Sequence, residues 1–223
     1  MLKRAYAAPA NIAAKTRRWM RALAPYARPA PPLRVRRAAL LVVDMQTFFL
    51  DADSPARLPA AAAALPAIRR LIEAARAAQR PVAYTVYASA AKSSGHPMRR
   101  WWRRPCPPNS RWAKLGGELR RERGEKVFAK AGYSALRATR LHAWLRTRRI
   151  TDLIVTGVLT NLCVESTVRD AFDAGYRVFV APDACAAATE DMHLGSLKNM
   201  VSGFAFVEQT QKLFATMTNR RGG

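Results

Sequence analysis

Cys163 is the residue of this chain whose surroundings best suit covalent chemistry. It lies in residues 157–164 (GVLTNLCV), directly after the apolar run 153–155 (LIV). A buried strand that ends in a glycine turn and leads into a helix presents backbone N–H groups, which favour a negatively charged thiolate. The pattern therefore predicts a nucleophilic thiol, although cysteine is also a common small core residue.

Two charged residues also close apolar runs. Asp44 follows the five apolar residues 39–43 (ALLVV), and Lys130 follows the short run 127–129 (VFA). A carboxylate at the carboxyl end of a buried strand lies where open α/β sheets bind ligands. As alternatives, Asp44 caps the next helix, or Lys130 is an ordinary surface residue. If the three side chains meet, the carboxylate accepts the thiol proton and the ammonium stabilises the charge on sulfur.

Strand and helix patterns alternate from residue 38 onward, and these elements must position the three side chains. Apolar runs predict strands near 38–43, 81–87, 126–129, 152–156, 177–181 and 204–207. Helical spacing predicts helices near 60–78, 136–148, 163–174, 187–201 and 208–217. Such alternation implies right-handed crossovers and a sheet covered on both faces. We predict a three-layer α/β/α fold with a central, mostly parallel six-stranded sheet.

Three ordered motifs resemble those of the isochorismatase-like cysteine hydrolases, over the part of the chain from about Ala38 to Phe214. The Asp-x-Gln motif of that family is similar to residues 44–46 (DMQ). Its lysine followed by an aromatic-Ser-Ala segment is similar to Lys130 and residues 133–135 (YSA). Its Gly-Val-x-Thr-x-x-Cys-Val motif is similar to residues 157–164, without a gap. The resemblance implies the fold predicted above.

The resemblance also implies a mechanism. It implies a catalytic triad of Asp44, Lys130 and Cys163, in which the cysteine attacks an amide carbonyl and water later releases the thioester. The backbone N–H groups of Leu159 and Cys163 would form the oxyanion hole. The family often has a cis peptide in this turn, which we expect here between Val158 and Leu159. The expected function is hydrolysis of a C–N bond in a small amide, carbamoyl or ureido compound.

Several side chains near the motifs are candidates for binding the small-molecule substrate. They are Gln46, Phe49, Trp101, Trp102, Tyr133 and Asn161. The aromatic residues among them are equally common as core packing. After the second strand the chain offers His96, and it has no His-x-His spacing, so we predict neither a metal ion nor a cofactor.

The first 37 residues differ in composition from the rest. They contain no Asp or Glu, have an amphipathic pattern near 11–23, and include a proline-rich stretch at 25–32 that reads as an extended linker. We predict a basic N-terminal arm and Pro-rich linker at 1–37, packed on the domain or on a neighbouring subunit, and the hydrolase domain at 38–223. Organellar targeting by this basic segment stays open as an alternative.

The charge of the chain raises a second class of function. The formal net charge is +23, and a basic surface attracts nucleic-acid phosphates. No nucleic-acid fold signature accompanies this charge, so a nucleic-acid-binding protein on a hydrolase scaffold is the alternative that we do not favour. A redox sensor that uses Cys163 is another alternative, and it needs a partner thiol from Cys106 or Cys185.

The remaining expectations concern partners and compartment. Three cysteines form no even disulfide framework, which favours a reducing, cytoplasmic location. No apolar stretch reaches the length of about 18 residues that a membrane-spanning helix needs, so no membrane partner is predicted. Homo-oligomers, either dimers or tetramers, are implied by the resemblance.

Overall fold

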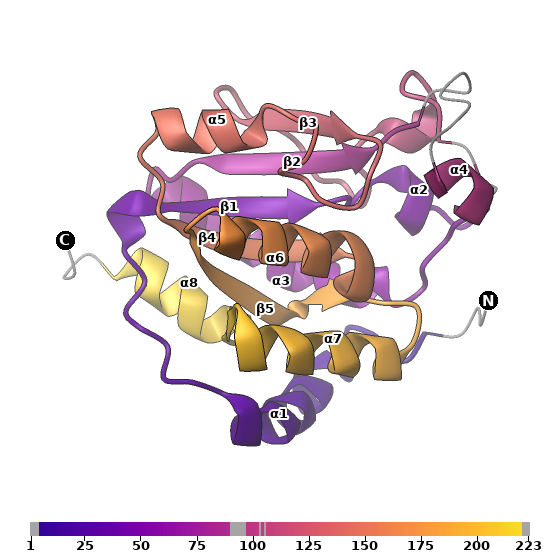
Figure 1. The fold of residues 1–223 in the computed structure, drawn as a ribbon. Helices are drawn as coiled ribbons and strands as arrows, with labels where there is room; N and C mark the ends of the chain where they lie inside the picture. Colours follow the sequence, from indigo (N-terminus) through magenta and orange to yellow (C-terminus); the bar gives the residue numbers. More distant parts are fainter. Residues whose placement is uncertain (1–4, 90–96, 103, 105, 220–223) are drawn as a thin grey trace.

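The chain folds around one parallel sheet. A computed structural model describes residues 5–89, 97–102, 104 and 106–219. The sheet has six strands in the order β3-β2-β1-β4-β5-β6 (Figure 1). They are β1 (Ala38–Val43), β2 (Val82–Tyr87), β3 (Lys126–Lys130), β4 (Asp152–Val158), β5 (Arg177–Ala186) and β6 (Phe206–Val207). Each neighbouring pair is parallel, which confirms the predicted class of fold.

Helices cover both faces of this sheet. They are α1 (Ile12–Leu23), α2 (Thr47–Leu50), α3 (Ala61–Ala77), α4 (Pro97–Trp102), α5 (Leu141–Thr147), α6 (Glu165–Asp173), α7 (Glu190–Gly203) and α8 (Thr210–Thr218). Shorter helical turns are η1 (Ala24–Tyr26), η2 (Val35–Arg37), η3 (Arg111–Ala113) and η4 (Thr160–Val164). Helices α3 and α8 pack on one face, whereas α5, α6 and α7 pack on the other. In the described part of the chain, no helix combines the length and the apolar character needed to cross a bilayer.

The two layers of the core follow from the alternation of side chains along β1. Leu40 and Val42 belong to the cluster under α3, while Leu41 and Val43 belong to the cluster under α5, α6 and α7. Successive side chains of a strand point to opposite faces, so a strand buried on both faces must be apolar throughout. This explains why the uninterrupted apolar run predicted the position of β1 correctly.

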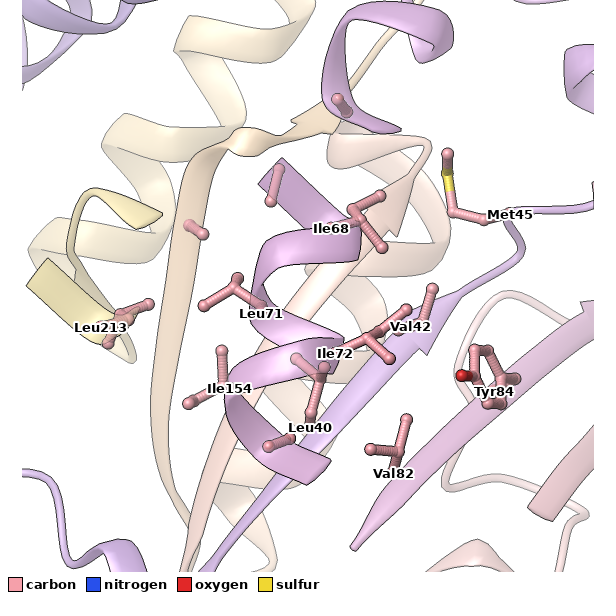
Figure 2. Packing of buried hydrophobic residues seen from close by; sticks show 14 of the residues in the cluster. Leu40, Val42, Met45, Ile68, Leu71, Ile72, Val82, Tyr84, Ile154 and Leu213 are labelled. Atoms are coloured by element: carbon pink, nitrogen blue, oxygen red, sulfur yellow. The ribbon is translucent and has the colours of Figure 1, made fainter. Parts of the chain in front are cut away.

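Helix α3 seals one face of the sheet. Its residues Ile68, Leu71 and Ile72 recur at helical spacing and lie over Leu40 and Val42 of β1 (Figure 2). All five side chains are at least 96% buried. Burial of a side chain of this size contributes about 1.5–3 kcal/mol relative to exposure, so this stripe anchors α3 on the sheet.

Two predicted elements differ from their expected bounds by five residues at one end. The helix predicted at 136–148 begins at Leu141, because Ala138 adopts a φ of +54° and Thr139 Oγ1 accepts a hydrogen bond from Leu141 N at 3.1 Å. The strand predicted to end at residue 181 continues to Ala186, past a shift in its register with β4. Both differences arise from contacts that a local apolar pattern does not contain.

The N-terminal segment contains the predicted helix, α1. Helix α1 contacts α7 and β5 of the same chain, so residues of this segment pack on the domain. Packing on the domain was one of the two placements expected from the sequence, and packing on a neighbouring subunit was the other. Trp19 and Leu23 are buried there. Residues 27–34 then form neither helix nor strand and lead to η2 and β1. The division of the chain at residue 37 stays a prediction.

Gly157 allows β1 and β4 to approach closely where β1 ends. A Cβ atom at this position would lie 2.0 Å from the carbonyl oxygen of Val43, and the residue has a φ of +112°. Both features exclude an ordinary side chain. The next residue after Val43 is Asp44, so this contact fixes the backbone that carries the carboxylate.

We expect Gly157→Ala to lower the free energy of unfolding by about 3 kcal/mol or more, because the methyl group clashes with backbone and the φ is unfavourable. Urea denaturation measures this change. The matched control is Gly195→Ala in α7, where a Cβ atom meets nothing within 4 Å. That control should be neutral or gain up to about 1 kcal/mol from helix propensity. Equal stabilities of the two variants would contradict this account.

Candidate active site

Three side chains from distant parts of the chain meet at the carboxyl edge of the sheet. Asp44 directly follows β1, Lys130 is the last residue of β3, and Cys163 lies in η4, which follows β4. Lys130 Nζ lies 2.7 Å from Asp44 Oδ2 and 3.2 Å from Cys163 Sγ. The structure therefore brings together the carboxylate, the ammonium and the thiol that the motifs contain.

Asp44 is held on two sides. Its Oδ1 accepts a hydrogen bond from Thr85 Oγ1 at 2.6 Å, and its Oδ2 faces Lys130. Its backbone has a φ of +51°, in the left-handed region that aspartate tolerates better than most residues. Asp44 N donates to Thr85 O at 3.1 Å, so the turn is tied to β2. The carboxylate is fully buried, with one oxygen anchored and the other directed at the reactive groups.

Lys130 is a buried cation with defined partners. Its Nζ donates to Gly132 O at 3.0 Å and to Cys163 Sγ, besides facing Asp44. Burial alone would lower the pKa of Lys130, but its interactions with the Asp44 carboxylate and with Cys163 outweigh burial, and the pKa is raised. The side chain is therefore a permanent ammonium at neutral pH. A buried ion pair of this kind depends on close geometry, because each isolated charge would be strongly unfavourable.

Cys163 differs from the expectation in its local structure and in its protonation. The sequence predicted a helix that begins at the cysteine, whereas the residue lies within a π-helical turn, η4, and α6 begins two residues later. Burial raises the pKa of the thiol to about 12, and the charge of Asp44 adds to this, although Lys130 opposes both. The resting group is a protonated thiol, and it needs a base at the moment of attack.

The turn before the cysteine has the expected backbone. The peptide bond between Val158 and Leu159 is cis. The carbonyl oxygen of Leu159 accepts hydrogen bonds from Leu162 N at 3.0 Å and from Val164 N at 3.1 Å. Leu159 and Cys163 both line the cavity described next.

A cavity of about 570 Å³ has Cys163 among its lining residues. Its wall is mainly apolar and aromatic, and two arginines, Arg57 and Arg104, contribute to it. The aromatic and larger aliphatic lining residues are Phe48, Phe49, Leu58, Tyr87, Met98, Trp102, Tyr133, Leu159 and Leu162. A hollow of this size with a reactive group in its wall is typical of a small-molecule site.

Three of the six predicted substrate-binding residues line this cavity. They are Phe49, Trp102 and Tyr133. Trp102 Nε1 donates a hydrogen bond to Tyr133 Oη at 2.9 Å, so these two side chains fix each other. Trp102 lies on α4, in the long segment between β2 and β3.

The structure places the other three predicted residues outside this cavity. Gln46 is fully buried and its amide binds backbone, since Nε2 donates to Tyr87 O and Trp112 O at 3.0 and 2.8 Å and Oε1 accepts from Tyr87 N. Trp101 is 78% exposed and does not line the cavity. Asn161 lines a second hollow of about 720 Å³ between α6 and α7, which shares Tyr133 with the cavity. A motif position alone does not tell whether a side chain points to the cavity.

Thr85 is a site residue that the sequence analysis missed. A threonine inside the otherwise apolar and aromatic strand β2 was the available signal, because β2 lies beside β1, which is followed by Asp44. Regarding metals, the described residues contain no group of three or more His, Cys, Asp or Glu side chains that could hold an ion, and His96 lies outside the described residues. The prediction of no metal and no cofactor stays a prediction.

The comparison with known proteins shows the family of the chain. A family model described as the isochorismatase domain matches residues 38–212, so the chain belongs to the isochorismatase family. The chain is 31% identical to nicotinamidase 3 of Arabidopsis thaliana over 181 residues, which cover 79% of this chain and 86% of that protein. It is 30% identical to N-carbamoylsarcosine amidase of an Arthrobacter species over 184 residues, which cover 79% and 70% of the two proteins.

A solved structure supports the same assignment. The crystal structure of a cysteine hydrolase from Pseudomonas syringae pv. phaseolicola 1448A matches with a TM-score of 0.81 at 26% identity, covering 85% of this chain and 97% of that one. The names of these three proteins give no support to the alternatives of nucleic-acid binding or redox sensing. In this structure Cys106, Cys163 and Cys185 are free thiols.

We expect Lys130→Met to lower the free energy of unfolding by about 3–5 kcal/mol, because it leaves the Asp44 carboxylate buried without its cation. The double variant Lys130→Met/Asp44→Asn removes that uncompensated charge and should recover part of the loss. Urea denaturation of the single and double variants measures both effects. If the double variant lost as much stability as the sum of the losses in Lys130→Met alone and Asp44→Asn alone, the ion pair would not be coupled as described.

Proposed function

We propose that the chain is a cysteine-dependent hydrolase that cleaves a C–N bond in a small amide, carbamoyl or ureido compound through a thioester. One observation carries this proposal: Asp44, Lys130 and Cys163 form a buried cluster, and the Cys163 member of this cluster lines a cavity of small-molecule size. The named relatives support the reaction class, since one is a nicotinamidase and another an N-carbamoylsarcosine amidase.

In the first half of the reaction, Asp44 acts as the general base. It takes the proton of the Cys163 thiol as the sulfur attacks the carbonyl carbon of the substrate. Because burial and the Asp44 charge hold the pKa of this thiol at about 12, proton transfer must accompany the attack. Lys130 remains an ammonium and stabilises the negative charge on sulfur or carboxylate throughout.

The attack forms a tetrahedral intermediate with a negatively charged oxygen. Backbone N–H groups of Leu159 and Cys163 are the proposed donors to this oxyanion, since both residues line the cavity next to the sulfur. Collapse of the intermediate breaks the C–N bond, and the protonated Asp44 returns its proton to the leaving amine or ammonia. The acyl group is then held as a thioester on Cys163.

In the second half, water replaces the amine. Asp44, again a carboxylate, takes a proton from water, and the resulting hydroxide attacks the thioester carbon. The C–S bond breaks, the sulfur regains its proton from Asp44, and a carboxylic or carbamic acid leaves. Trp102, Tyr133 and Phe49 hold the rest of the substrate, because their side chains line the cavity around the sulfur.

Two further expectations, on the compartment and on the oligomeric state, belong to the same proposal. The enzyme works in the cytoplasm, where a reducing environment keeps Cys163 and the other two thiols free, as they are in this structure. It assembles as a homo-oligomer, a dimer or a tetramer, as the resemblance to its family implies. Size-exclusion chromatography with light scattering tests the second expectation.

A panel of amides, ureides and carbamoyl amino acids, assayed for ammonia, tests the activity. We expect Cys163→Ala to lower turnover of any substrate found by about a thousandfold or more, because the nucleophile is lost. Asp44→Asn should lower it by about 10²–10⁴-fold through loss of the general base. Circular dichroism confirms that each variant is folded.

The control for this test is Cys185→Ala, which removes a buried thiol that does not line the cavity. Its turnover should stay close to that of the unaltered chain. Full activity in Cys163→Ala, or a loss in Cys185→Ala as large as that in Cys163→Ala, would refute the proposed nucleophile.

Adjacent tryptophans on α4 offer a matched test of the cavity. We expect Trp102→Ala to raise KM by about tenfold, which equals about 1.4 kcal/mol of lost binding, because this side chain lines the cavity. Trp101→Ala should leave KM unchanged, because Trp101 is 78% exposed and does not line it. Steady-state kinetics measures both, and equal effects of the two substitutions would contradict the assignment.

A further inference from the structure

The N-terminal arm, defined here as residues 5–26, lies outside the part of the chain that the isochorismatase domain matches. Its helix α1 packs along α7 at the bottom of the molecule as drawn in Figure 1. Helix α7 in turn contacts the turn η4, which carries Cys163. The arm is thus separated from the nucleophile by a single helix.

One carboxylate at the start of α7 holds α1. Lys15 Nζ lies 2.7 Å from Glu190 Oε2, and Arg18 Nη2 lies 2.7 Å from Glu190 Oε1. Trp19 Nε1 donates to the same Oε1 at 2.8 Å. Three donors from one helix on one partly buried carboxylate fix the position of the arm, and especially the position of the Trp19 ring.

The Trp19 ring covers His193, the next residue of α7 on that side. The two ring centroids are 4.5 Å apart, and Tyr6 lies 6.0 Å from the same imidazole. The Tyr6 hydroxyl accepts a hydrogen bond from Ala187 N at 3.1 Å, which anchors this second ring. His193 is completely buried beneath the arm.

His193 has a polar contact with the nucleophile turn. Its Nδ1 lies 2.8 Å from Thr160 Oγ1, while its Nε2 has no hydrogen-bond partner among the described residues. Thr160 is the first residue of η4. Ser196, also on α7, donates to the carbonyl oxygen of Thr160 at 3.0 Å. Helix α7 therefore holds Thr160 by both its side chain and its backbone, three residues before Cys163.

We propose that His193 is a positioning residue that holds the cysteine-bearing turn through Thr160, and that the N-terminal arm maintains this contact by keeping water from the imidazole. The catalytic consequence of this inference rests on the proposed hydrolase function, but the contact itself does not. The arm is then a part of the active-site support that the family domain by itself does not contain.

The protonation of His193 makes the proposal testable. The titratable groups that interact with the residues around the ring are Tyr6, Lys15, Arg18, Glu165, Cys185 and Glu190. The same two helices also carry Arg17 and Arg21 on α1 and Asp191 and Lys198 on α7. Burial lowers the pKa of His193 to about 3, and the charge of Glu190 opposes this only in part. The ring is therefore neutral above that pH. If water reaches it, it should titrate near its ordinary pKa of about 6.5 and, once charged, leave its buried site.

The test compares the unaltered chain with Trp19→Ala and with the double variant Trp19→Ala/His193→Gln, whose glutamine does not titrate. NMR spectroscopy follows the His193 ring and the backbone amides of η4 from about pH 8 to about pH 5.5, and kcat is measured over the same range. In Trp19→Ala we expect His193 and the η4 amides to titrate together near about pH 6.5. Between about pH 8 and about pH 5.5, the kcat of this variant should fall by about tenfold more than the kcat of the unaltered chain.

The double variant and the unaltered chain should show neither transition. A role in packing alone would lower kcat by the same factor at every pH. The proposal is overturned if His193 does not titrate in Trp19→Ala, if it titrates while the η4 amides and the kcat profile do not respond, or if the transition persists without His193.

The experiment stays decisive in two further cases. If Trp19→Ala does not fold, Glu190→Gln replaces it, since this change keeps the shape of the side chain but removes the charge that holds Lys15 and Arg18. If the unaltered chain hydrolyses none of the amides, the proposed function fails, and the titration of the η4 amides still decides whether His193 positions the turn.

Discussion

The ion pair between Lys130 and Asp44 is the interaction on which the site depends. Two charges with almost no contact with water are stable only if they lie close together and their remaining polar atoms are satisfied. Their separation of 2.7 Å meets the first condition, and the bonds from Thr85 to Asp44 and from Lys130 to Gly132 meet most of the second. The sulfur of Cys163 completes the coordination of the ammonium, so the nucleophile belongs to a fixed electrostatic arrangement.

The order of strands explains how such distant residues reach one another. Strand β2 lies between β1 and β3, and its Thr85 hydroxyl bonds to Asp44 on one side. Lys130, at the end of β3, extends its long side chain past β2 to the same carboxylate. Parallel strands joined by crossover helices end at the same edge, so the topology collects the carboxyl ends of β1, β3 and β4 in one place. The close approach of Gly157 to Val43 then sets the spacing between the first and last of these ends.

The unusual positive charge of the chain has a structural component. Lys15 and Arg18 of the basic N-terminal segment bind Glu190. Arg177 binds the buried carboxylate of Asp152, at the amino ends of β5 and β4. These contacts show that part of the arginine and lysine content stabilises the fold. They also connect the segment outside the family domain with α7, and through α7 with the turn that contains the cysteine.

The sequence by itself determined the class of fold and the approximate strands, because buried parallel strands such as β1 and β4 require continuous apolar runs. Its three ordered motifs also contained the carboxylate that follows β1, the ammonium that closes β3 and the thiol that lies in η4. Only the tertiary structure decided that Gln46 binds backbone, that Trp101 faces solvent, and that Asn161 faces another hollow. It also decided that the Cys163 thiol is protonated and that the N-terminal arm covers His193. These properties depend on burial and on contacts between segments far apart in the chain, and neither local composition nor periodicity contains that information.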